Sequence, residues 1–152
     1  MGQRVNLAQA VKRASRVFLI GNGGSAANAI HISNDWVACG IDARPLLDIG
    51  TITAIANDFG YKYIFSKQIY VVGEKDALLV ALSGSGKSPN ILEGLRAAKK
   101  KNMTTWLIVG ESNSPASRLA HYTTEDGDNM QDAEEWQIRV GHMVMRWLKK
   151  HS

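Results

Sequence analysis

The stretch ALLVALSGSGKS, residues 77–88, runs directly into the helical pattern of Pro89–Lys101 and decides the fold of this chain. A short, uninterrupted apolar run such as Ala77–Leu82 is typical of a strand that is covered on both faces, as in a parallel sheet. Proline in the first turn, apolar residues along one side and lysines at the end predict a helix over residues 89–101. This strand, polar loop and helix form one unit of an α/β fold.

Similar units flank this stretch on both sides. The other predicted strands are Arg16–Ile20, Pro45–Ile49, Thr105–Val109 and a weaker His121–Thr124. The other predicted helices are one with a stripe of Leu7, Ala8, Val11 and Ala14, then Ser25–Cys39, one or two within Thr51–Val71, and Met130–Lys150. Alternating strands and helices imply right-handed crossovers. We therefore predict a three-layer α/β/α sandwich with a five-stranded parallel sheet in the order 2-1-3-4-5, which binds ligands between strands one and three.

Composition places the chain among ordinary globular proteins. Its 152 residues suit a single domain over 1–152. It has one cysteine, so no internal disulfide can form, which favours a reducing, cytoplasmic location. No apolar run approaches the roughly 20 residues of a membrane span, and the first residues have no signal-peptide core. We expect no membrane partner.

The formal net charge of +4 is mild. Lysines 99–101 and 149–150 stand at predicted helix ends, where cations complement the helix dipole. We prefer that interpretation to a nucleic-acid surface, so nucleic acid is not an expected partner.

Two glycine-rich loops follow strands one and three. The first is GNGGS, residues 21–25, and the second is SGSGKS, residues 83–88. Glycines let the backbone approach a ligand, and the free N–H groups of a following helix attract an anion. Hydroxyls alternating with glycines can wrap a phosphate, although each loop alone could be only a tight or flexible turn. Because the two strands should be neighbours, we predict one shared phosphate site.

Two similar motifs fit less well. A nucleoside-triphosphate P-loop needs glycine where Ala81 stands. Gly21, Gly23 and Ala26 match the loose dinucleotide fingerprint, but this leaves the second loop unexplained. A nicotinamide-dependent enzyme is therefore a minor alternative.

Acids and histidines recur on two predicted helices. His31 and Asp35 are four residues apart and share one helix face. On the last helix, Glu134 and Glu135 precede His142 by eight and seven residues, within about 80° on the helix wheel. Each histidine could be structural. Together these groups could instead form a four-ligand site for Zn²⁺ or a similar ion, or an acid–base pair.

The motifs taken together resemble a known family. GNGGSAANAIH, TAIANDFGY, LSGSGKSPNIL and a last helix with Glu-x7-His occur in the order seen in the sugar isomerase (SIS) domain family, over residues 16–148. The resemblance is greatest to its sedoheptulose 7-phosphate isomerases, also called phosphoheptose isomerases. It implies a flavodoxin-like sheet, a homo-oligomer (tetramer or dimer), and conversion of sedoheptulose 7-phosphate to D-glycero-D-manno-heptose 7-phosphate by proton transfer between C1 and C2.

The resemblance also implies residue roles. Asp35 and His142 would be the catalytic base and acid, and Asp58 would touch the substrate. His31, Asp35, Glu134 and His142 would hold Zn²⁺. The phosphate and the adjoining part of the substrate would be bound by Asn22, Gly23, Ser25, Ser83, Ser85 and Ser88.

Four features depart from the family pattern. Asp35 stands for a glutamate, Glu134 for a glutamine and Gly84 for a threonine, and the N-terminal helical region is short. Because a base displaced by about 1 Å can cost on the order of 100-fold in rate, the shorter Asp35 keeps a second hypothesis open. In it, the chain is a non-catalytic SIS module that binds a sugar phosphate or a protein, such as a replication initiator.

Overall fold

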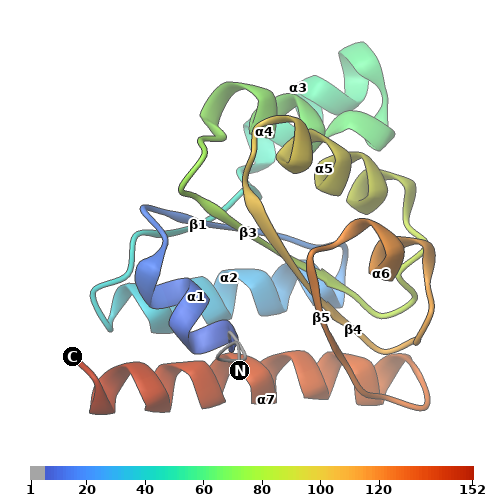
Figure 1. The fold of residues 1–152 in the computed structure, drawn as a ribbon. Helices are drawn as coiled ribbons and strands as arrows, with labels where there is room; N and C mark the ends of the chain where they lie inside the picture. The colour runs from blue at the N-terminus through green and yellow to red at the C-terminus, as the bar shows by residue number, and fades with distance from the viewer. Residues whose placement is uncertain (1–5) are drawn as a thin grey trace.

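The computed structural model of this chain describes residues 6–152, with a five-stranded parallel sheet as its middle layer (Figure 1). The strands are β1 (Val17–Ile20), β2 (Ala43–Pro45), β3 (Leu78–Ser83), β4 (Thr104–Val109) and β5 (Tyr122–Glu125). Their order is β2-β1-β3-β4-β5, and every neighbouring pair is parallel. The predicted fold class and strand order are confirmed.

Helices cover both faces of the sheet (Figure 1). One face carries α1 (Leu7–Arg13), α2 (Gly24–Val37) and α7 (Met130–Lys150). The other carries α3 (Ile49–Phe59), the 3₁₀ turn η1 (Tyr61–Tyr63), α4 (Ser66–Val72), α5 (Pro89–Lys100) and α6 (Pro115–Leu119). Successive strand residues point to opposite faces, so Val17 and Leu19 join the α2–α7 core while Phe18 and Ile20 join the α5 core. The sheet is thus buried on both sides, which explains its continuous apolar runs.

The predicted strand over Pro45–Ile49 is wrong. The strand that pairs with β1 is Ala43–Pro45, because Leu19 lies opposite Pro45 and the Leu46 N–H makes the next bond to the Leu19 carbonyl. Leu46 is buried but belongs to the loop that follows. Hydrophobicity alone suggested a strand there, whereas the start of α3 ends the extended segment.

Asp48 begins α3 as its N-cap. Its carboxylate accepts hydrogen bonds from the Thr51 backbone N–H and from the Thr51 hydroxyl, both at 2.9 Å. These bonds favour the ionised form and lower the pKa of Asp48. The cap therefore strengthens as the carboxylate ionises.

The other helices agree with the sequence patterns to within a few residues. Residues 51–71, expected to hold one or two helices, divide into α3, η1 and α4, because Gly60 adopts a φ of 105° that ends α3. The short α6 has no counterpart among the predicted elements. On α7, Val140 and Val144 are buried but Met143 is exposed. No helix within residues 6–152 is both long enough and apolar enough to cross a lipid bilayer.

Candidate functional site

The two glycine-rich loops meet at the carboxyl ends of β1 and β3. Ile20 pairs with Ala81, so the loops that follow these strands emerge side by side. They line one cavity of about 100 Å³, which we call the serine cavity. Its lining residues are Asn22, Ser25, Leu82, Ser83, Gly84, Ser85, Ser88, Met130 and Glu134. Four serines therefore line one small cavity.

Hydrogen bonds hold the second loop in shape. The Ser83 hydroxyl accepts from the Gly86 N–H at 2.9 Å, and the Ser85 hydroxyl accepts from the Lys87 N–H at 3.2 Å. Ser88 is the N-cap residue of α5, but its side chain makes no capping bond. Because the Ser83 and Ser85 oxygens act as acceptors in these bonds, their hydrogens remain available to donate to a ligand.

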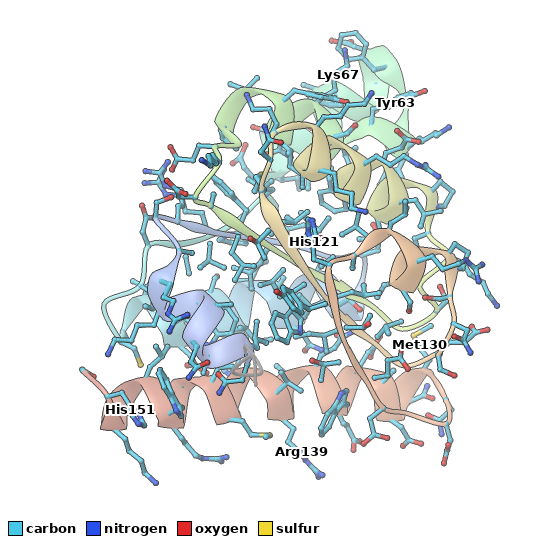
Figure 2. The ribbon with its side chains drawn as sticks, viewed as in Figure 1. Tyr63, Lys67, His121, Met130, Arg139 and His151 are labelled. Carbon is cyan, nitrogen blue, oxygen red and sulfur yellow. The ribbon has the colours of Figure 1, made fainter. Side chains whose placement is uncertain are left out.

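Met130, labelled in Figure 2, lies in the first turn of α7 and lines the serine cavity. A Cβ atom on Gly84 would collide with the Met130 sulfur, so the glycine leaves room for this side chain. Gly23, by contrast, is exposed with a φ of 54°, which suits the tight turn into α2.

Asn90 and Tyr61, which sequence reasoning missed, hold the first loop in place through Asn22. Asn22 and Asn90 form a reciprocal amide pair, with both N–H···O distances at 2.8 Å. The Tyr61 hydroxyl also donates to Asn22 Oδ1 at 2.9 Å. Asn90 is only 2% exposed, so this pair ties the GNGGS loop to the start of α5. The available signal was a polar residue in the first turn of an otherwise apolar helix face.

Gln137 is a third residue that the sequence did not reveal. It is fully buried between α2 and α7 and donates from Nε2 to the Ser25 hydroxyl at 3.0 Å. Asn28 Nδ2 donates to its Oε1 at 2.9 Å. The only sequence signal was a glutamine at a position that continues the apolar face of α7.

His31, Asp35 and His142 converge on one another. Asp35 Oδ2 lies 3.3 Å from Nε2 of each histidine, and the two Nε2 atoms are 3.2 Å apart. Asp35 Oδ2 is buried and forms no well-aligned hydrogen bond within the described residues. The three groups lie close enough together to hold a metal ion.

Close packing of α2 against α7 brings this cluster together. A Cβ atom on Gly141 would lie 2.5 Å from Ile32 Cγ1, so glycine is needed where the helices touch. The Trp36 indole N–H donates to the Gly141 carbonyl at 3.1 Å across the same contact. His142 is the next residue, which is why it reaches Asp35.

The remaining predicted site residues lie elsewhere. Glu134 is eight residues, or about 12 Å, from His142 along α7. Its carboxylate stands beside Gly24 and faces the serine cavity, so it is not part of the three-residue cluster. Glu135 is exposed and lines a different depression. Asp58 is exposed on α3, does not line the serine cavity, and accepts a bond from Asn57 Nδ2 at 3.1 Å.

Comparison with known proteins places this arrangement in a family. Residues 5–110 match the family described as SIS domain. The chain is 37% identical over 142 residues to a phosphoheptose isomerase of Burkholderia pseudomallei, covering 89% of this chain and 70% of that protein. It is 33% identical over 148 residues to the phosphoheptose isomerase of Nitratidesulfovibrio vulgaris, covering 92% and 71%.

A solved structure gives the same result. The phosphoheptose isomerase of Neisseria gonorrhoeae superposes with a TM-score of 0.88 at 26% identity, over 95% of this chain and 81% of that one. Sequence and structure agree, and the chain belongs to the SIS domain family, in which its relatives are phosphoheptose isomerases.

Proposed function

We propose that the chain is an aldose–ketose isomerase that converts sedoheptulose 7-phosphate to D-glycero-D-manno-heptose 7-phosphate. The observation that carries this proposal is the pairing of a serine-lined cavity at one end of α2 with a histidine–carboxylate cluster further along the same helix. Ser25 and His31 are six residues apart, about 9 Å along the axis, so one sugar phosphate could contact both. The names of the relatives support the same substrate.

The serine cavity would bind the phosphate. Ser25, Ser83, Ser85 and Ser88 supply hydroxyl donors, while Asn22 and Gly23 shape the first loop. The N-termini of α2 and α5 add backbone N–H groups and the positive ends of their dipoles. The carboxylate of Glu134 opposes an anion here, so this side chain would have to turn aside when the phosphate binds.

Asp35 and His142 would move the proton. One removes the proton from C1 or C2 of the sugar, and the other transfers a proton to and from the carbonyl and hydroxyl oxygens. The proton lost from one carbon is replaced at its neighbour, so the reaction is redox-neutral overall. Their 3.3 Å separation allows them to act on adjacent atoms of one substrate.

Alternatively, the cluster suits a Zn²⁺ ion held by His31, Asp35 and His142, and the ligand atoms of Asp35 and His142 would then not exchange protons. A tetrahedral ion with ligand bonds of about 2.0–2.1 Å requires ligand atoms about 3.3–3.4 Å apart. The three observed separations are 3.2, 3.3 and 3.3 Å, and the unpaired Asp35 oxygen faces the gap. When bound, such an ion would act as a Lewis acid toward a carbonyl oxygen. Glu134, expected as a fourth ligand, is left out of this proposed set because its carboxylate faces the serine cavity.

The proposed homo-oligomer rests on the exposed apolar residues of α3, and the proposed location rests on the cysteine content. Every residue of α3 is at least partly exposed, including Ile49 at 78% and Phe59 at 55%. Such apolar exposure favours a homo-oligomer, dimer or tetramer, in which α3 and Asp58 approach a substrate. A single cysteine favours the cytoplasm.

The test is an isomerase assay on sedoheptulose 7-phosphate with and without added Zn²⁺. Product should appear in at least one condition and be lost in the His142→Gln variant. If calorimetry shows that the sugar phosphate binds but no product forms under either condition, the chain is a binding module and the proposed reaction is wrong.

A further inference from the structure

We propose that Gln137 is a positioning residue that turns the Ser25 hydroxyl so that it donates into the serine cavity. The inference deepens the proposed function and rests on it, because it assumes that this cavity takes a phosphate. Gln137 has no exposed surface and lies on α7, whereas Ser25 lies in the first turn of α2.

The backbone carbonyl of Glu134 sets the direction of the hydrogen bonds that lead from Asn28 to Ser25. The Glu134 carbonyl oxygen can only accept, and it receives a bond of 3.0 Å from the Asn28 side chain. The atom of Asn28 that faces Glu134 must therefore be the amide nitrogen, Nδ2. This assignment removes the usual ambiguity between the nitrogen and oxygen of an amide side chain.

The same nitrogen then orients Gln137. Asn28 Nδ2 has a second hydrogen, and it donates this one to Gln137 Oε1 at 2.9 Å. With its oxygen turned toward Asn28, Gln137 must present Nε2 to Ser25, which lies 3.0 Å away. An amide nitrogen only donates, so the Ser25 oxygen must accept.

The consequence concerns the one hydrogen of the Ser25 hydroxyl. Because its oxygen accepts from Gln137, that hydrogen must point to a different acceptor. Within residues 6–152 no hydrogen bond uses the Ser25 hydroxyl as a donor, although the residue is only 4% exposed and lines the serine cavity. A phosphate oxygen in the cavity would be an acceptor-only partner at the end where α2 has its positive dipole.

The substitution Gln137→Glu would reverse only the hydrogen bond to Ser25. One carboxylate oxygen could still accept from Asn28, but the other could only accept from Ser25. The Ser25 hydroxyl hydrogen would then point to the new carboxylate and no longer into the cavity. The negative charge of that carboxylate would also lie next to the phosphate site. A methionine would fill nearly the same volume and leave the Ser25 hydroxyl free to rotate.

The experiment measures the Kd of inorganic phosphate, and the KM and kcat for sedoheptulose 7-phosphate, in five proteins besides the wild type. They are Gln137→Glu, Gln137→Met, Ser25→Ala, the double variant Ser25→Ala/Gln137→Met, and the control Gln9→Glu, which makes the same charge change on α1. Unfolding in urea confirms that each variant folds.

Loss of a hydrogen bond to a charged acceptor should raise the phosphate Kd by about 10- to 100-fold in Gln137→Glu and by less, about 2- to 10-fold, in Gln137→Met. KM should rise in parallel while kcat changes little, and Gln9→Glu should match the wild type. If Gln137 acts through Ser25, the double variant should bind no more weakly than Ser25→Ala.

Each other outcome contradicts a defined part of the reasoning. Unchanged phosphate affinity in both Gln137 variants, with a wild type that binds, overturns the role of Gln137 alone. Additive losses in the double variant also overturn it, because Gln137 would then act on phosphate binding independently of Ser25. A wild type that neither binds phosphate nor isomerises the sugar overturns the proposed function, and this inference with it.

Discussion

Replacing Gly141 with alanine tests whether the contact between α2 and α7 positions the histidine–carboxylate cluster. The new Cβ would lie 2.5 Å from Ile32 Cγ1 and 2.9 Å from Ile32 Cδ1, whereas carbon atoms in contact prefer about 3.5–4.0 Å. Ile32 is fully buried and branched at Cβ, so it cannot easily rotate away. The helices must therefore separate by about 1 Å.

That separation acts on stability and activity differently. Alanine gains about 1 kcal/mol of helix propensity over glycine, and overpacking costs about 1–3 kcal/mol, so the net loss of stability should be about 0–2 kcal/mol. The Asp35–His142 distance should lengthen from 3.3 Å to about 4 Å. A displacement of this size in a catalytic group can lower the rate by on the order of 100-fold. The catalytic rate should thus fall strongly in Gly141→Ala, while the free energy of unfolding changes little.

The assay is kcat/KM for sedoheptulose 7-phosphate beside the free energy of urea unfolding. Gly94→Ala is the matched control, because its Cβ would crowd Ile20 Cδ1 at 2.9 Å on the other face of the sheet. Adding Ile32→Ala to Gly141→Ala removes the clash and should restore part of the lost activity despite a further loss of stability. Equal activity losses in Gly141→Ala and Gly94→Ala, at equal stability, would refute the reasoning.

Three further predictions follow from single groups. His142→Gln should lower kcat by about 10²- to 10⁴-fold with little change in thermal midpoint, since glutamine cannot exchange a proton; stopped assays measure this, and a rate near that of the wild type would exclude His142 as acid or base. Removal of metal by a chelator should lower the isomerase activity, and return of Zn²⁺ should restore it. Metal analysis should find about one ion per chain, bound through His31, Asp35 and His142. A His31→Ala variant that retains its ion would contradict the proposed metal site. Because the pKa of Asp48 is lowered in the folded state, its stabilising effect is complete above the unfolded value of about 3.9 and disappears as the pH falls through the folded value. Urea unfolding should therefore show wild type more stable than Asp48→Asn at pH 7, with the gap closing below about pH 4; a gap that is independent of pH would contradict the assignment.

Much of the fold was predictable because its signals are local. Continuous apolar runs mark strands buried on both faces, and a serine, glycine and proline sequence marks the passage from β3 to α5. The two loops could be placed together from sequence because parallel strands end at the same edge of a sheet. Pro45–Ile49 failed as a strand because buried leucines in a loop look the same as leucines in a strand until pairing with β1 is known.

The sequence by itself determined most element types and the two hydroxyl-bearing loops, because these depend on neighbours within a few residues. The alternation of strands and helices along the chain predicted the strand order. The sequence also showed His31 and Asp35 on one helix face. Only the tertiary structure decided that His142 meets them while Glu134 faces the serine cavity, and that Gln137 reaches Ser25. These contacts join residues more than 100 positions apart, and they depend on how closely α7 approaches α2, which is set by Gly141 against Ile32 and not by any local pattern.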